Sequence, residues 1–141
     1  MDTLLLPARI EALYRAIDFV VKAAEDSGWK DDRTRLEVAV EEIFVNIASY
    51  AYGGEAGRIQ IGCGLHEGMF VVQFRDWGKP FNPLKQPEPD IDSPAARRPI
   101  GGLGIYLTKT YADCIFYEYA DGVNILTIGM NLQKEENYEN H

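Results

Sequence analysis

The sequence predicts an α+β fold, in which helices cover one face of a mostly antiparallel, mixed sheet. In the first third of the chain, apolar residues recur at steps of three and four, which is typical of amphipathic helices. Later segments alternate apolar and polar residues and come in pairs joined by tight turns, which is typical of antiparallel hairpins. The 141 residues fit one domain over residues 1–133, followed by a polar tail at 134–141 that we expect to be disordered.

The first elements are expected to be a short apolar strand at residues 3–6 and a helix at residues 7–27. The helical pattern depends on Ile10, Leu13, Ile17, Val20, Val21 and Ala24. Pro7 suits the first turn of this helix, and Gly28 suits its C-terminal cap.

A second helix is predicted from the candidate N-caps Asp31 and Asp32 to about Tyr52, where two glycines end it. One face of this helix carries Leu36, Val40, Ile43 and Ile47. Further apolar neighbours widen that face, so we expect the helix to be largely buried.

Two hairpins complete the predicted sheet. The first joins residues 58–65 to residues 69–76 through a tight turn. The second joins residues 114–119 to residues 123–132 through the Asp-Gly pair at 121–122, which is the strongest short hairpin signal.

Composition excludes some classes of partner. The formal net charge is −8, which argues against a general binder of nucleic acid or of anionic membranes, because such proteins present a basic face. No stretch approaches the run of about 20 apolar residues that a membrane-spanning helix needs. The start of the sequence lacks the features of a signal peptide, so we expect a cytoplasmic protein.

Polar residues at a spacing of one helical turn interrupt the second helix. Glu42 and Asn46 are four residues apart and share one face, which Ser49 continues. A carboxylate there can accept a proton from an attacking hydroxyl, and an amide oxygen is a ligand that suits Mg²⁺. The alternative is that these residues form a solvated stripe at the edge of the helix.

A second polar feature ends the first hairpin, at Asp76-Trp77-Gly78. A buried carboxylate at Asp76 can accept a hydrogen bond from an exocyclic amine, and Gly78 lets a flat ring approach the backbone. Phe81 can pack nearby. The alternative is an ordinary turn, because aspartate and glycine are common turn residues.

The long segment between the hairpins is rich in proline and lacks periodicity over residues 79–100. Loops of this length are uncommon inside a compact domain and are often functional lids. A third helix is predicted at residues 103–112, and the loop that starts it contains Gly101, Gly102, Leu103 and Gly104. Its backbone N–H groups can point at an anion, unless the loop is only a flexible stem. Arg97 and Arg98 can reach a terminal phosphate or remain solvated.

The order of these motifs resembles that of the GHKL ATPases, and within them of the anti-sigma-factor serine kinases. The resemblance is carried by Leu6-Pro7-Ala8, by EEIFVNIASYAY (41–52), by DWGKPFNP (76–83) and by GGLGIYLTKTYAD (101–113). It implies a Bergerat-type α/β sandwich that binds ATP and Mg²⁺.

The resemblance also implies a role for each motif. Asn46 would hold Mg²⁺, Glu42 would act as the general base, and Asp76 would take the adenine amine with Gly78 beside it. The phosphates would lie against Gly101, Gly102 and Gly104, with Arg98 as the lid cation. The expected nucleotide contacts also include Ser49, Phe81 and Leu103.

The implied activity is that of a protein serine/threonine kinase. Its substrate would be a serine or threonine of a STAS-type anti-anti-sigma partner, and as a homodimer it would also sequester a sigma factor. Two alternatives remain: an ATP-dependent protein-binding switch without catalysis, and the catalytic domain of a histidine kinase. The last needs a phospho-accepting histidine on a dimerising helix, which neither His66 nor His141 provides.

Overall fold

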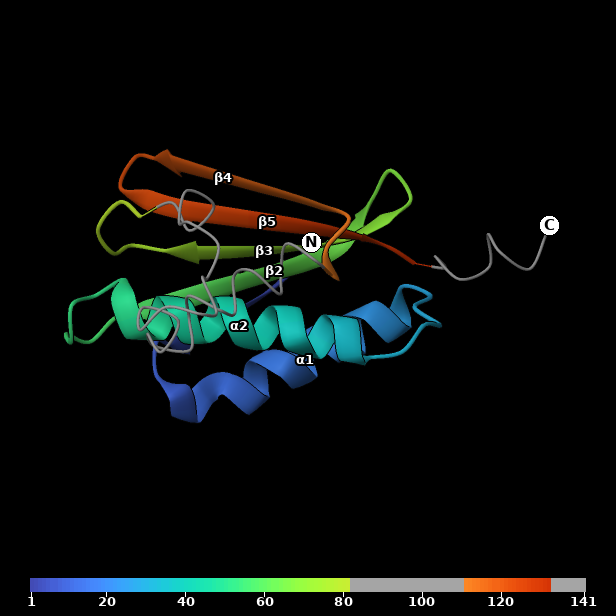
Figure 1. The fold of residues 1–141 in the computed structure, drawn as a ribbon, viewed down its shortest axis with the longest axis horizontal. Coiled ribbons are helices and arrows are strands. Elements are labelled where there is room, and N and C mark those ends of the chain that lie inside the picture. The colour runs from blue at the N-terminus through green and yellow to red at the C-terminus, as the bar shows by residue number, and fades with distance from the viewer. Residues whose placement is uncertain (82–110, 133–141) are drawn as a thin grey trace, which may run out of the picture.

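The computed structural model describes residues 1–81 and 111–132, which form one five-stranded sheet with helices on one face (Figure 1). In chain order the elements are β1 (Asp2–Pro7), η1 (Ile10–Ala12), α1 (Leu13–Asp26), α2 (Thr34–Tyr50), β2 (Arg58–His66), β3 (Met69–Asp76), β4 (Cys114–Ala120) and β5 (Val123–Asn131). The strand order is β1-β2-β3-β5-β4. The predicted α+β class and both predicted hairpins are confirmed.

The described strands pair only in antiparallel fashion, so this part of the chain shows no parallel pair of a mixed sheet. Both hairpin turns place two residues at positive φ, which matches the right-handed twist of the strands. The first turn has Glu67 at φ 50° and Gly68 at φ 80°, and the second has Asp121 at φ 53° and Gly122 at φ 80°.

The predicted start of the first helix is wrong. Pro7 is the last residue of β1, where it pairs with Arg58, and α1 begins only at Leu13 after the short η1 turn. Because β1 is an edge strand, proline can end it without breaking a central hydrogen-bond ladder. The other end is as expected: Gly28 has φ 104°, and its N–H donates to the Glu25 carbonyl over 3.1 Å.

Neither predicted cap occupies the N-cap position of α2, which is Arg33 and makes no side-chain capping hydrogen bond, but the predicted cap Asp32 contacts the first helical residue from one position earlier. The Asp32 Oδ1 atom accepts hydrogen bonds from the Thr34 backbone N–H over 2.8 Å and from the Thr34 hydroxyl over 2.7 Å. At the other end, Tyr50 is the last helical residue, and Gly53 and Gly54 follow with φ of 58° and 87°. Positive φ is accessible to glycine at little cost, which explains the chain reversal there.

Figure 1 shows the helix pair covering one face of the sheet, and the buried residues of the core lie between these two layers. Alternate residues of the central strands face the helices, so each strand contributes a row of buried side chains. The largest fully buried side chains include Phe44, Phe70, Phe74, Ile43, Ile59, Ile61 and Ile128. None of the helices in the described part is long and apolar enough to cross a membrane.

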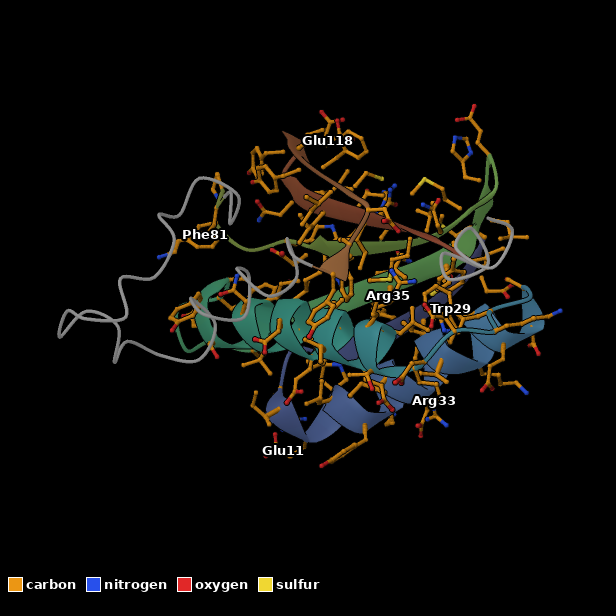
Figure 2. All side chains as sticks on the ribbon, turned by 45° about the vertical axis from the view of Figure 1, so that its right-hand side comes forward. Glu11, Trp29, Arg33, Arg35, Phe81 and Glu118 are labelled. Atoms are coloured by element: carbon orange, nitrogen blue, oxygen red, sulfur yellow. The ribbon has the colours of Figure 1, made fainter. Side chains whose placement is uncertain are left out.

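A cation and an indole ring join the start of α2 to the sheet (Figure 2). The Arg35 guanidinium lies 4.9 Å from the centre of the Trp29 ring, and its Nη2 donates to Asp31 Oδ2 over 3.1 Å and to the Asn131 carbonyl over 3.3 Å. Trp29 is only 6% exposed and packs edge-on against Phe70. This cluster holds the N-terminal end of α2 against the sheet.

Candidate functional site

A pocket opens between the C-terminal half of α2 and the neighbouring ends of β3, β4 and β5. Its walls are formed by Ile43, Asn46, Ile47, Ala51, Asp76, Phe81, Tyr117, Asn124 and Leu126. The empty space is about 380 Å³, a volume that includes the open mouth. Phe81 lies at the sheet end beside the C-terminal end of α2 (Figure 2). The pocket therefore brings together Asn46, Asp76 and Phe81, which the sequence predicted separately.

Asp76 is the buried acid of this pocket, with only 5% of its surface exposed. Its Oδ1 atom accepts hydrogen bonds from the Gly78 N–H over 3.0 Å and from Asn124 Nδ2 over 2.9 Å. Burial raises the pKa of this carboxyl above its usual range, against the opposing effect of these two hydrogen bonds. Among the described residues Oδ2 receives no hydrogen bond, so it can accept one from a ligand.

Gly78 brings the backbone of the following turn against the end of α2. A Cβ atom at Gly78 would lie 2.1 Å from the carbonyl oxygen of Ala51, which is far closer than two such atoms can approach. The same carbonyl accepts a hydrogen bond from the Lys79 N–H over 3.1 Å. The close approach therefore requires glycine at this position. The predicted role of Gly78, access for a flat ring, stays a prediction.

We expect Gly78→Ala to destabilise the domain, because the new methyl group must push the turn away from Ala51. The cost should be about 1–3 kcal/mol in the free energy of unfolding, measured by urea denaturation. Gly64→Ala is a matched control, since a Cβ there would lie no closer than 3.7 Å to any neighbour. An equal loss in both variants would contradict this account of Gly78.

Tyr52 stabilises the same turn through its hydroxyl group. Its hydroxyl accepts a hydrogen bond from the Trp77 N–H over 2.9 Å and donates one to the Arg58 carbonyl. The Arg58 guanidinium lies 5.4 Å from the centre of the Trp77 ring, which is 42% exposed. The Asp76-Trp77-Gly78 segment is therefore held by contacts to Ala51 and Tyr52, which follow α2, and to Arg58 of β2, and an ordinary turn would not need them.

Glu42 and Asn46 are both buried, so a solvated edge stripe is excluded for these two residues. Asn46 is 6% exposed and lines the pocket, and its side chain makes no hydrogen bond to the described residues. Glu42 lies one turn earlier, with 9% of its surface exposed, and does not itself line the pocket. Its buried Oε2 atom has no hydrogen-bond partner in the described part. Burial, followed by the charge of Glu41, raises the pKa of Glu42.

Ser49 differs from its two predicted neighbours. It lies on the same side of α2 but is exposed, and it does not line the pocket. Its predicted contact with a nucleotide therefore gains no support from the described walls.

Two polar residues of the pocket, Tyr117 and Asn124, were not singled out by the sequence analysis. Asn124 is 4% exposed and faces Asp76 directly across the β3–β5 pair. The signal that could have revealed it is its position in β5, where Asn124 falls on the same alternation as the buried residues Leu126, Ile128 and Met130. A lone amide in such a row needs partners, because a buried polar group without hydrogen bonds is costly.

Residues 6–130 match the family described as histidine kinase-like ATPase domain. The chain belongs to this family. Because the match runs from the end of β1 through both helices and both hairpins and includes the pocket, the buried Asp76 and Asn46 lie inside the histidine kinase-like ATPase domain.

Curated relatives of this ATPase domain include serine-protein kinases. The chain is 33% identical over 100 residues to serine-protein kinase RsbW of Bacillus mycoides (strain KBAB4), and 34% identical over 100 residues to RsbW of Bacillus thuringiensis (strain Al Hakam). Each match covers 68% of this chain and 62% of the relative. The matched region thus spans less than two thirds of these kinases.

Solved structures of histidine kinases share the fold of this ATPase domain. The mycobacterial sensor histidine kinase MprB matches with a TM-score of 0.55 and 17% identity, covering 92% of this chain and 97% of that structure. The blue-light activated histidine kinase of Erythrobacter litoralis EL346 matches with a TM-score of 0.55 and 15% identity, over 90% of this chain and 42% of that one. The expected Bergerat-type architecture is confirmed at the level of the fold.

The predicted glycine loop of this ATPase domain lies outside the described residues. That holds for Arg97 and Arg98 and for Gly101, Gly102, Leu103 and Gly104. The predicted third helix also falls there except for its last two residues, Tyr111 and Ala112, as does the tail at 134–141. The roles assigned to these segments stay predictions.

Proposed function

We propose that this chain binds Mg-ATP and transfers the γ-phosphoryl group to a serine or threonine of a partner protein. The observation that carries the proposal is the convergence of Asp76 and Asn46 on one pocket, with the buried Glu42 one helical turn away. The similarity to the RsbW serine-protein kinases supports the same reaction class.

Asp76 would read the adenine base. Its Oδ1 atom is held by protein donors, and Oδ2 is the acceptor that an exocyclic amine can reach. A carboxylate held in this way accepts from an amine and repels a carbonyl oxygen, which distinguishes adenine from guanine.

We expect Asp76→Asn to reduce the preference for ATP over GTP by at least about tenfold, because the substituted amide can donate as well as accept. Competition binding of the two nucleotides measures the preference. The matched control is Asp18→Asn, which changes an exposed aspartate of α1 and should leave the preference unchanged. Unchanged preference in Asp76→Asn would argue against adenine readout at this residue.

The pocket residues fit a magnesium ion held together with the phosphates. The Asn46 amide lines the pocket and has no hydrogen bond to the described residues, so its oxygen atom can serve as a ligand. The described part contains no group of three or more acidic, histidine or cysteine ligands. That suits Mg²⁺, which commonly takes one or two protein ligands and completes its shell with phosphates and water. Asn46 would hold the ion, which when bound neutralises charge on the phosphate oxygens.

Glu42 would be the general base. The unpartnered Oε2 atom can accept the proton of the attacking serine hydroxyl, and its raised pKa makes the carboxylate a stronger base than an exposed glutamate. The residues predicted to hold the phosphates, Arg98, Gly101, Gly102, Leu103 and Gly104, complete the proposed site.

The proposed substrate is a STAS-type anti-anti-sigma protein, with a sigma factor as a second partner. The test is incubation of the chain with γ-labelled ATP and such a protein. Label on a serine or threonine of the partner supports the kinase. Nucleotide binding without transfer to a partner that forms a complex with the chain would favour an ATP-dependent binding switch. The predicted cytoplasmic location stays a prediction.

We also propose a homodimer, formed through the face of the sheet that the helices leave uncovered. The register places Phe116 opposite Thr127 on that face, and the Phe116 side chain is 64% exposed. With Met1 and Val71 it lines a hollow on the sheet surface. Exposed apolar patches of this kind mark association surfaces. Analytical ultracentrifugation of the purified chain measures the oligomeric state.

A further inference from the structure

We propose that Asn124 and Tyr117 are positioning residues that orient Asp76 and thereby set the preference of the pocket for adenine. The inference builds on the proposed ATP site and assigns to it two residues of the second hairpin. Asn124 comes from β5 and Tyr117 from β4, and both line the pocket.

Asn124 uses both ends of its amide. Its Nδ2 atom donates to Asp76 Oδ1 over 2.9 Å and to the Lys79 carbonyl over 2.9 Å. Its Oδ1 atom accepts from the Phe81 N–H over 3.2 Å and from the Tyr117 hydroxyl. The reverse orientation would place the amide oxygen against a carboxylate and a carbonyl, so the surrounding groups determine which way the amide points.

This arrangement decides which oxygen of Asp76 is left for the base. Because Asn124 and the Gly78 N–H both occupy Oδ1, the carboxylate is fixed in rotation and its Oδ2 atom remains as the acceptor. The Asn124 hydrogen bond also lowers the pKa of Asp76, which opposes the effect of burial and favours the ionised form that accepts from an amine.

Tyr117 holds the amide from the opposite side. Burial is the main cause that raises the pKa of Tyr117, so at neutral pH its hydroxyl keeps its proton and donates to Asn124 Oδ1. The chain of contacts therefore runs from Tyr117 through Asn124 to Asp76. Packing of the core alone would not require these hydrogen bonds. An apolar side chain at the buried position of Asn124 would pack without any polar partner.

The test compares the affinities of ATP and inosine triphosphate, which carries an oxygen in place of the exocyclic amine of adenine. We expect Asn124→Ala to lower the ATP-to-inosine-triphosphate affinity ratio roughly tenfold, the usual value of one hydrogen bond to a charged group. Tyr117→Phe keeps the ring and should lower the ratio roughly threefold. Asn131→Ala, at the exposed end of β5, and Tyr119→Phe, two residues along β4, are matched controls that should leave it unchanged.

Two further readouts separate positioning from general damage. In the Asp76→Asn background, Asn124→Ala should change the ratio no further, because its effect acts through the carboxylate. Removing the Asn124 donor should also raise the pKa of Asp76, so ATP binding in Asn124→Ala should fail at a higher pH on acidification than in the wild type.

An unchanged ratio in both Asn124→Ala and Tyr117→Phe, together with a collapsed ratio in Asp76→Asn, would overturn the inference and leave the proposed function intact. Failure of the wild type to bind either nucleotide would overturn both. If Asn124→Ala does not fold, Tyr117→Phe decides the matter by itself, since it removes one hydroxyl and keeps the packing of the ring.

Discussion

Glu42→Gln is expected to reduce phosphoryl transfer to the partner protein by at least about 100-fold, while Mg-ATP affinity changes by less than about threefold. Glutamine keeps the size of the side chain but cannot accept the serine proton. Transfer is measured with γ-labelled ATP, and affinity by calorimetry. Glu41→Gln is the matched control, because Glu41 is the exposed neighbouring carboxylate. Equal transfer by the wild type and Glu42→Gln would remove Glu42 from the general-base role.

The pH dependence of transfer gives a second measurement on the same residue. Glu42 must be ionised to act as a base, and its pKa is raised by burial and by Glu41. Transfer should therefore decline on acidification at a pH above the ordinary glutamate range of about 4.3. A raised pKa in the folded state also means that the stability contributed by Glu42 is full at low pH and is lost as pH rises through that pKa. Glutamine carries no charge, so this pH-dependent loss of stability should be absent in Glu42→Gln.

Asn46→Ala is expected to weaken Mg-ATP binding about 10- to 100-fold and binding of magnesium-free adenosine by less than about threefold. In the proposed site the amide oxygen of Asn46 would serve the metal, whereas Asp76, another residue that lines the pocket, would read the base. Calorimetry with the two ligands gives both affinities. Ser49→Ala tests the exposed side of the same helix face. Equal losses of the two ligands in Asn46→Ala would exclude Asn46 as the metal ligand.

The helices and hairpins could be predicted because their signals are local. Apolar spacing along α1 and α2 and the Asp-Gly turn at 121–122 each depend on a few neighbouring residues. Pro7 misled the prediction, because proline suits both a first helical turn and the end of an edge strand, and only the pairing of β1 with Arg58 separates the two.

The residues of the candidate site could be predicted where a short motif in one segment of the sequence singles them out. Asn46, Asp76 and Phe81 do meet in one pocket, although burial rather than spacing shows that Asn46 is not a surface residue. Asn124 was missed because its importance arises from the β3–β5 register, which places it opposite Asp76. No pattern in the sequence reports which residues face each other across strands that are far apart along the chain.

The Trp77 ring, half-exposed next to the buried Asp76, gives the protein an optical probe of its own. The sequence contains two tryptophans, and the other, Trp29, is buried beside Arg35 and Phe70 at the far end of α2. Emission from Trp29 is insulated from solvent, whereas Trp77 shares a backbone hydrogen bond with Tyr52 and a ring contact with Arg58. A spectral change on adding nucleotide would therefore originate at the pocket, and a Trp77→Phe variant would lack it, so occupancy can be followed without an attached dye.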